Sequence, residues 1–476
     1  MSRHLPLCLA LASVAGAASG APAVQSSSDQ AEQVFLTIYN ADRALVRELR
    51  TVELPAGELD LEYADVAAQI DPTTVHITSL SHPGQLGVLE QNFEFDLLSP
   101  ERLLENFVGR DITIRSRSTA DPNQALSRTG TLLSVQGGRI VRTPEGLILN
   151  PEGEISVPGD TGDLRAEPTL VWLLSNAAAG AHQLEASYLT TGLSWHADYV
   201  AVVNEDDTRM DLTAWVTIEN RSGATFRDAR LKLVAGTPNI VQPPQMQDLY
   251  MMERAAVAAA PGAPQFTEQA FFEYHLYTLQ RPTTVRDMQT KQMSLFTAGG
   301  VPVTKRFLFE AQQLYPWFQT GGQRGEPEHV QVVVEFENSE ANRMGMPMPQ
   351  GTVRLYKADP DGALQFIGED RIEHTPRDER VRLQVGEAFD VVAERVQTAF
   401  RQVAGNDTEQ DWEITVRNHK DEAITVTLVE HAGGDWTIRQ ESQGHSDVDA
   451  TTFEYTVEVP AHGSATVTYT IHFDND

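Results

Sequence analysis

Cysteine is nearly absent from this chain of 476 residues, and the single one, Cys8, lies in the apolar segment near the N-terminus. Beyond residue 23 there is no thiol, so that part of the chain can form no disulfide, no cysteine metal site and no cysteine nucleophile. Its domains must therefore be stabilised by burial of apolar side chains. A chain of this length can supply such cores, in roughly three or four domains.

Basic residues are also scarce, with 36 lysines and arginines against 67 acidic residues and a formal net charge of −31. Binding of nucleic acid and of anionic lipid surfaces is disfavoured, because both require a basic stripe or patch. The plain interpretation of this charge is a well-solvated surface. Binding of cations or of a basic partner is the more specific alternative.

No apolar run after the first residues is long enough to span a membrane, which takes about 20 residues. The N-terminus has a short basic start, roughly a dozen apolar positions, and small residues at either Ala18-Ser19-Gly20 or Ala21-Pro22-Ala23. This layout predicts a secretory signal peptide over residues 1–23. Leu7 precedes Cys8, which does not fit a lipoprotein anchor. We therefore expect an exported protein, periplasmic or secreted, without a membrane span.

Sequence motifs of known catalytic sites are missing. The chain has no Gly-x-Ser-x-Gly, no His-Glu-x-x-His, no P-loop and no dinucleotide-binding glycine pattern. An Asp-Pro-Asp-Gly run at 359–362 lacks the glutamate of a calcium loop and is typical of a hairpin turn. The sequence therefore predicts no catalytic residue, no metal ligand set and no cofactor.

Alternation of apolar and polar residues dominates the chain and predicts a mainly β protein. One short helix is expected after Ser99, which suits the N-cap, with proline at the next position and Gly109 at the end. The segment 389–400 fits a helix or a strand. After the signal peptide at 1–23, strand spacing and turn residues predict four β units. The first two are a small N-terminal β domain with the short helix at 30–105 and a small SH3/Sm-like β-barrel at 106–160. The other two are a central β-sandwich at 165–405, with a flexible insertion at 238–268, and a C-terminal immunoglobulin-like sandwich at 408–476.

Two short segments place titratable side chains on one strand face. His196 and Asp198 alternate with aromatic neighbours, and so do Glu273, His275 and Tyr277. If these two strands were neighbours, the histidines and carboxylates could form a zinc site or an acid–base pair. The alternative is that all five residues have ordinary surface and core-edge roles.

A polar run at 279–292 holds three of the few cations, Arg281, Arg286 and Lys291. These could grip an anionic group, or they could pair internally with the acidic surroundings. A second candidate for ligand binding is Trp317, whose ring could serve as a platform for a sugar. The alternative for Trp317 is an aromatic plug in a small core.

Seven short motifs resemble those of the domain of unknown function 4139 family. They are Gly-Leu-Ser-Trp-His-Ala-Asp-Tyr at 192–199, Tyr-His-Leu-Tyr-Thr-Leu at 274–279, Gln-Thr-Lys-Gln at 289–292, Gly-Met-Pro-Met-Pro-Gln-Gly at 345–351, Ile-Gly-Glu-Asp at 367–370, His-Thr-Pro at 374–376 and Val-Gly-Glu-Ala-Phe-Asp at 385–390. The likeness extends from about residue 30 to the C-terminus. It implies an exported, bacterial, largely β protein, distantly similar to mucoidy-inhibitor-like proteins, and it implies no catalytic residues.

These observations favour a non-enzymatic binding or envelope-associated structural protein whose partner is a protein or a polysaccharide of the cell envelope. Two alternatives stay open. One is a metal-dependent or acid–base hydrolase acting outside the cytoplasm, which would need the histidine and carboxylate candidates to converge in a pocket. The other is a carbohydrate-binding protein.

Overall fold

In the computed structural model, the protein is described over residues 22–117, 125–159, 164–236, 265–320, 326–403 and 405–474, and it is mainly β as predicted. The predicted signal peptide lies outside these ranges up to residue 21, and its last residue begins the first strand. The predicted insertion at 238–268 lies outside them as far as residue 264. Its last residues instead belong to a strand, in which Phe266 is buried in the core.

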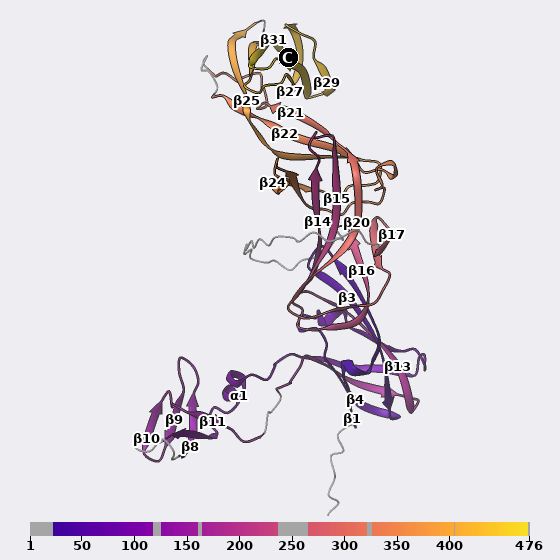
Figure 1. Ribbon diagram of the computed structural model, residues 1–476. Helices are drawn as coiled ribbons and strands as arrows, with labels where there is room; N and C mark the ends of the chain where they lie inside the picture. The colour runs from indigo at the N-terminus through magenta and orange to yellow at the C-terminus, as the bar shows by residue number, and fades with distance from the viewer. Residues whose placement is uncertain are drawn as a thin grey trace, which may run out of the picture.

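Three sheets share one continuous hydrophobic core in the lower and middle parts of the molecule (Figure 1). The N-terminal sheet has the order β1-β4-β12-β6, formed by β1 (Ala23–Ser26), β4 (Gly57–Ala64), β12 (Thr169–Asn176) and β6 (Leu86–Glu94). The large sheet has the order β17-β18-β16-β2-β3-β13-β5, formed by β17 (Phe266–Phe271), β18 (Tyr274–Leu279), β16 (Phe226–Ala235), β2 (Ala31–Tyr39), β3 (Arg43–Leu54), β13 (Gly180–Thr190) and β5 (His76–Ser79), with β19 (Thr283–Val285) paired to β16. The motif sheet has the order β20-β15-β14-β23-β24, formed by β20 (Gln289–Pro302), β15 (Arg209–Asn220), β14 (Leu193–Val203), β23 (Gly351–Ala358) and β24 (Leu364–Ile372).

The expected N-terminal domain, 30–105, does not keep a sheet of its own. Strand β3 pairs with β13 along its length, and β2 pairs with β16, so strands from the start of the chain lie inside the central sandwich. Alternation shows which face of a strand is buried but not which distant strand completes its sheet. The first and central units are therefore one structural body.

The C-terminal sheet contains nine strands and has its own core, which runs from Phe309 to Phe473. Val334, Phe336, Val381 and Leu383 of this sheet belong instead to the core shared by the other three sheets. It takes β21, β22 and β25 from the segment expected to belong to the central sandwich. The segment 389–400 is part of a strand, β25, and not a helix. The strands in spatial order are β28 (Asp435–Glu441), β31 (Gly463–Asp474), β26 (Thr408–Asn418), β25 (Arg380–Gln402), β22 (Glu328–Glu337), β21 (Thr304–Glu310), β27 (Ile424–His431), β30 (Thr452–Val459) and β29 (Ser446–Asp449).

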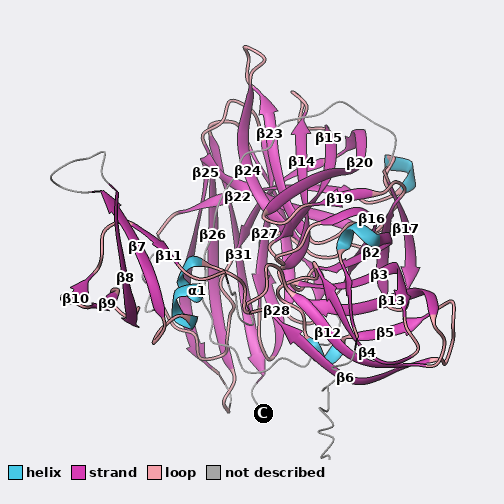
Figure 2. Ribbon diagram, turned by 90° about the horizontal axis from the view of Figure 1, so that it is seen from below, coloured by secondary structure: helices cyan, strands magenta, loops and turns pink. Residues whose placement is uncertain are grey.

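A side module stands apart from the rest of the molecule, as Figures 1 and 2 both show. Its short helix α1 (Pro100–Asn106) begins as predicted, because Ser99 Oγ accepts a hydrogen bond from the Arg102 backbone N–H at 3.1 Å. Its strands follow the predicted order but form an open sheet, β10-β9-β8-β7-β11, rather than a closed barrel. They are β7 (Asp111–Arg117), β8 (Ala125–Ser134), β9 (Ile140–Thr143), β10 (Gly146–Leu149) and β11 (Glu154–Ser156).

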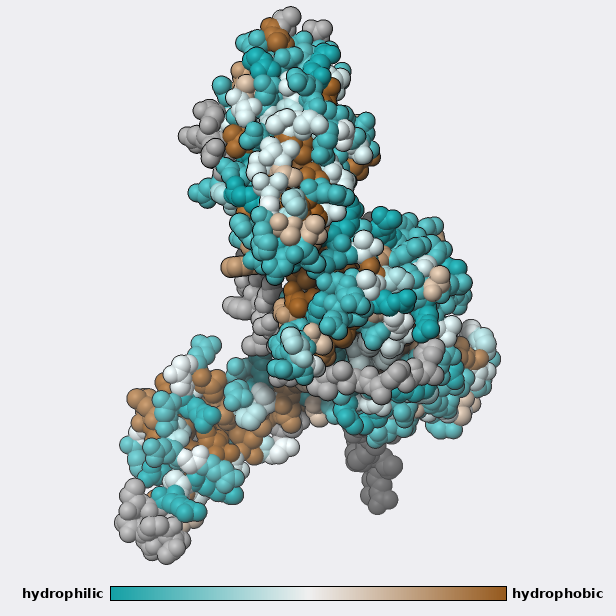
Figure 3. Space-filling view, turned by 45° about the horizontal axis from the view of Figure 1, so that its top comes forward, coloured by the Kyte–Doolittle hydropathy of each residue, from teal (hydrophilic) through white to brown (hydrophobic). Residues whose placement is uncertain are grey.

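The open edge of the side module leaves apolar side chains in solvent. Leu147 and Leu149 on β10 are 61% and 68% exposed, because they lie on the face opposite the core residue Val141, with which Ile148 between them is paired. Figure 3 shows hydrophobic atoms gathered on this module. Short 3₁₀ turns complete the structure at Ser28–Gln30, Pro72–Thr74 and Glu340–Asn342. Among the described helices, none has both the length and the apolar character needed to cross a bilayer.

Candidate functional site

A row of polar side chains crosses the motif sheet, with the carboxylate of Asp198 at its centre. Asp198 Oδ2 accepts a hydrogen bond from Thr217 Oγ1 at 2.6 Å and lies 3.3 Å from His196 Nε2. The other oxygen accepts from Arg354 Nη1 at 3.1 Å, and Arg354 Nε continues the row to Glu369 at 3.3 Å. His196 and Asp198 thus share one strand face, as the alternation of β14 predicts.

Contacts within this row shift the pKa values of both Asp198 and His196. Burial raises the pKa of the Asp198 carboxyl, but hydrogen bonds from His196, Thr217 and Arg354 outweigh it and lower that pKa to about 2. The hydrogen bond to Asp198 raises the pKa of His196 against the effect of partial burial. The two side chains therefore favour an ion pair. This pair lies within one strand, β14, while the contacts of Asp198 with Thr217 and Arg354 join β14 to its two neighbours. The pair can also exchange a proton with a substrate if a substrate reaches it.

The second histidine segment lies on the large sheet. His275 Nδ1 lies 2.8 Å from Glu268 Oε1 on the neighbouring strand β17. Tyr277 is buried, and its hydroxyl donates to the backbone oxygen of Pro347 at 2.8 Å. Glu273 lies exposed in the turn before β18. Tyr277 therefore anchors Pro347, in the segment 345–351, to the large sheet.

His196 and His275 are not brought together. Trp195 points into the core and packs edge-on against Tyr277, with ring centres 6.1 Å apart. The next residue along β14, His196, therefore points out of the opposite face of the motif sheet. A zinc site or acid–base pair from both histidines required their strands to be neighbours, but β14 and β18 belong to different sheets. No cluster of metal-ligating side chains is found among the described residues.

The three cations Arg281, Arg286 and Lys291 lie near one another around β19. Lys291 Nζ donates to the backbone oxygen of Thr284 at 2.9 Å, and Arg281 Nη2 donates to Gln265 Oε1 at 3.0 Å. Burial lowers the pKa of Lys291, and the charges of the two arginines lower it further. Within the described ranges no carboxylate pairs with any of the three. The anion-binding interpretation of this segment stays a prediction.

An exposed aromatic stack lies on the C-terminal sheet. The rings of Tyr315 and Trp317 are nearly parallel, 10° apart in plane, with centres 5.1 Å apart. Trp317 is 74% exposed, so it is not a plug in a small core. These two residues are named the aromatic platform, and the segment 315–320 that carries it is named the platform loop.

Buried polar side chains fix the backbone of the platform loop. Gln410 Nε2 donates to the Tyr315 oxygen at 2.8 Å, and Thr408 Oγ1 donates to the Pro316 oxygen at 2.8 Å. Gln397 Nε2 donates to the Phe318 oxygen at 2.9 Å. All three side chains are more than nine-tenths buried. The loop is therefore held in one conformation, with Trp317 outward and Phe318 inward against Trp412.

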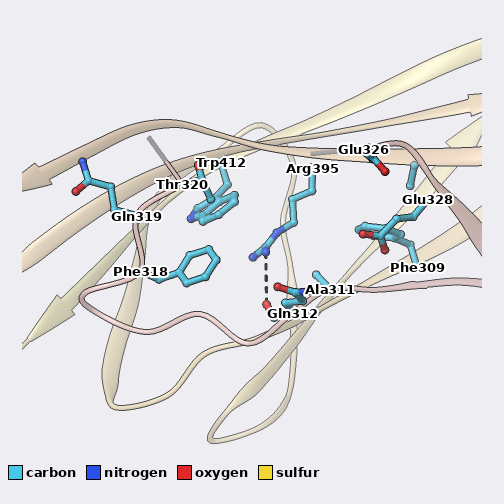
Figure 4. Close-up of a pocket in the computed structure, with 11 residues that line it drawn as sticks. Phe309, Ala311, Gln312, Phe318, Gln319, Thr320, Glu326, Glu328, Arg395 and Trp412 are labelled. Carbon is cyan, nitrogen blue, oxygen red and sulfur yellow. Dashed lines mark hydrogen bonds between the residues drawn. The ribbon is translucent and has the colours of Figure 1, made fainter. Parts of the chain in front are cut away.

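A pocket of about 420 Å³ opens beside this loop (Figure 4). Phe318 and Trp412 line one side of it, and the carboxylates of Glu326 and Glu328 line the other. Arg395 lies between them, with its guanidinium 4.0 Å from the Trp412 ring centre. The pocket therefore offers aromatic surface, hydrogen-bond donors and hydrogen-bond acceptors to one ligand.

Arg395 is held from below by a fully buried carboxylate. Its Nη2 atom lies 2.5 Å from Glu430 Oε2, and the Tyr469 hydroxyl lies 3.5 Å away. Arg395 Nε has no partner within the described structure, nor does Glu430 Oε1. Burial raises the pKa of Glu430, although the charge of Arg395 opposes this effect. The buried carboxylate beneath the pocket therefore fixes the guanidinium of Arg395 in the pocket lining.

Sequence reasoning found Trp317 but missed the residues that position it. One signal was available: Gln410 occupies an inward position of the alternating strand β26, between Thr408 and Trp412. A polar residue at such a position needs a buried partner. Arg395 and Glu430 gave no comparable signal, because their pairing joins strands that are not neighbours in the sequence.

Comparison with protein families finds one match, to the domain of unknown function (DUF4139), over residues 184–474. A comparison with curated proteins finds no match. The matched range is shorter than the likeness expected from about residue 30. It includes the motif sheet, the platform loop and the pocket beside it. Since it spans more than half of the chain, the protein belongs to the DUF4139 family.

Proposed function

We propose that this protein is an exported, non-enzymatic binding protein of the cell envelope that holds a polysaccharide on the aromatic platform. The observation that carries the proposal is the exposure of Trp317 on a loop whose backbone is fixed by buried side chains. Export rests on the N-terminal signal pattern of residues 1–23. The binding role rests on the geometry of the C-terminal sheet.

Exposure of a stacked tryptophan is costly unless a ligand covers it. A large aromatic ring contributes strongly to binding when it is buried, and Trp and Tyr are enriched among residues that dominate binding energy. The flat stack of Tyr315 and Trp317 presents an extended apolar face. The C–H face of a sugar ring is complementary to such a surface, because it is apolar and nearly flat.

Fixation of the loop favours binding further. A ligand that meets a preformed surface does not have to order the loop, so less of the binding free energy is lost. Gln397, Thr408 and Gln410 provide this fixation through hydrogen bonds with the backbone of four residues of the loop, which are Tyr315, Pro316, Phe318 and Thr320. The adjoining pocket adds hydrogen-bonding groups, which sugar hydroxyls need.

The negative net charge of the chain and the two glutamates beside the platform favour a neutral polysaccharide over an acidic one. The net charge is −31, and Glu326 and Glu328 line the pocket next to the platform. A polyanion would be repelled by both. Hydroxyl groups of a neutral sugar can donate to these carboxylates and accept from Arg395.

Affinity electrophoresis tests this proposal. The chain from residue 24 is run in native gels that contain a neutral envelope polysaccharide fraction from the host, and its retardation is compared with that in gels without polysaccharide. We expect retardation of the unmodified chain and at least a tenfold weaker effect for Trp317→Ala, equivalent to about 1.4 kcal/mol. Phe272→Ala is the matched control, because Phe272 is 83% exposed on a different sheet edge.

Equal retardation of Trp317→Ala and the unmodified chain would overturn the platform. Retardation of neither protein in any neutral fraction would overturn polysaccharide binding itself.

A further inference from the structure

Strand β10 forms one free edge of the side module. It pairs with β9 on one side, and no strand in the described part of the chain pairs with its other side. Figures 1 and 2 both place β10 on the side of the module that faces away from the rest of the molecule. This edge is therefore accessible to another chain.

Backbone groups of two leucines point toward this free edge. The backbone N–H of Asn150 donates to the Arg139 oxygen at 2.7 Å, just beyond the end of β10. Hydrogen-bonded and non-hydrogen-bonded pairs alternate along an antiparallel ladder, so Ile148 forms the next hydrogen-bonded pair with β9. The N–H and C=O groups of Leu147 and Leu149 therefore face away from β9. Each leucine offers one donor and one acceptor to a further strand.

The edge lacks the features that keep edge strands apart. Soluble proteins protect such an edge with charged side chains, a proline or a bulge. Strand β10 reads Gly-Leu-Ile-Leu, and it pairs with β9 in an unbroken register. The side chains of Leu147 and Leu149 are mostly exposed, and Figure 3 shows hydrophobic atoms gathered on this module. Removal of these side chains from water by an added strand is favourable.

The side module carries almost no net charge, unlike the chain as a whole. The chain has a formal net charge of −31. In the module, the described residues 100–117 and 125–159 contain seven arginines and six acidic residues. Two copies that met through the rest of the molecule would bring like charges together, whereas two side modules can meet without this repulsion. Charge therefore favours the module as the place where two copies of this chain touch.

The order of residues in β10 suits antiparallel pairing with an identical strand. A two-fold axis makes one surface patch face itself, so the patch must be self-complementary. Leu147 and Leu149 lie symmetrically about Ile148. In an antiparallel pair centred on Ile148, each Leu147 lies opposite Leu149 of the second copy, and the two exchange backbone hydrogen bonds. Glu145 lies opposite Pro151 of the second copy, so this register places no like charges opposite each other.

We propose that β10 is a self-association edge, at which two copies of this protein pair their β10 strands and join their side modules into one continuous sheet. The edge is short, and small interfaces are typical of weak, reversible complexes. A dimer of this kind carries two aromatic platforms, which strengthens attachment to a repeating polymer. That consequence depends on the proposed function, whereas the association itself does not.

Disulfide trapping tests the pairing, because the chain from residue 24 contains no cysteine. Ile148→Cys places one thiol opposite its copy in a non-hydrogen-bonded pair, whose Cα atoms lie about 4.5 Å apart, within the range of a disulfide. Leu364→Cys, at a leucine of β24 that is 55% exposed, is the matched control. We expect mild oxidation to give the linked dimer at least tenfold faster for Ile148→Cys than for Leu364→Cys. Equal rates would overturn the pairing.

Sedimentation equilibrium measures the association without a cross-link, again on the chain from residue 24. We expect a reversible monomer–dimer equilibrium that Leu147→Lys combined with Leu149→Lys weakens at least tenfold, because charges on an edge strand oppose pairing. Both leucines are exposed, so the double variant should keep the urea transition of the unmodified chain. Leu364→Lys should leave the equilibrium unchanged.

A monomer at every concentration would overturn self-association, and a dimer that the double variant leaves intact would overturn the β10 edge. Neither result bears on polysaccharide binding by a single chain, which the affinity gel measures separately.

Discussion

Replacement of Asp198 by asparagine tests the polar row of the motif sheet. The folded chain lowers the pKa of this carboxyl from 3.8 to about 2. Each tenfold change in proton affinity corresponds to roughly 1.4 kcal/mol, so the charged carboxylate stabilises the fold by about 2 kcal/mol at neutral pH. The pKa of Asp198 is lower in the folded chain than in the unfolded chain. This stabilisation is therefore fully present at pH values above the unfolded pKa and is lost as the pH falls toward 2. At pH 3 about half of it should remain.

Urea unfolding followed by tryptophan fluorescence measures the effect. Trp215 pairs directly with Asp198 on the neighbouring strand and reports on this sheet. We expect Asp198→Asn to lower the free energy of unfolding by about 2 kcal/mol at pH 7 and by about half as much at pH 3. Asp206→Asn, at an exposed hairpin turn, is the control. The same loss at both pH values, or a loss no larger than that of the control, would refute the assignment of this row.

Four further results are expected. His196→Gln should destabilise the chain more at pH 5 than at pH 8 in the same urea assay. The pKa of His196 is higher in the folded chain than in the unfolded chain, so its contribution to stability is present below the unfolded pKa and is lost as the pH rises through the folded pKa. Gln410→Leu should cost about 1–3 kcal/mol by leaving backbone oxygens of the platform loop unpaired, and should weaken polysaccharide binding in the affinity gel. Arg395→Met alone should cost about 3–5 kcal/mol in urea unfolding, whereas its combination with Glu430→Leu should cost less, because the single change leaves a buried charge unpaired. Mass spectrometry of the exported chain should show removal of the N-terminal signal after residue 20 or 23, and an intact N-terminus would contradict export by this signal.

Alternation and capping residues predicted where the strands and the helix lie, but they did not predict which strands pair with each other. Helix α1 and the strands of the side module lie where capping residues and alternation placed them, because these signals act within a few residues. The pairing of β3 with β13 joins segments more than a hundred residues apart. Neither strand carries a local signal for its partner. The prediction that residues 30–105 form a separate domain is therefore not matched by the sheet topology, in which β3 pairs with β13.

Candidate sites show the same division between local and distant information. Alternation along β14 correctly placed His196 and Asp198 on one face. It could not show that Arg354, which follows 156 residues later in the chain, would be the ion-pair partner of the Asp198 carboxylate. The aromatic run around Trp317 was visible in the sequence, but its exposure depends on buried hydrogen bonds from β25 and β26.

Binding of polysaccharide by the platform is the central claim, and equilibrium dialysis against the neutral polysaccharide of the host envelope tests it most directly. The unmodified chain, Trp317→Ala and Phe272→Ala are compared at neutral pH after each is shown to be folded by its urea transition. We expect the unmodified chain and the Phe272 variant to bind with equal affinity and the Trp317 variant at least tenfold more weakly. Equal affinity of all three proteins would contradict the account.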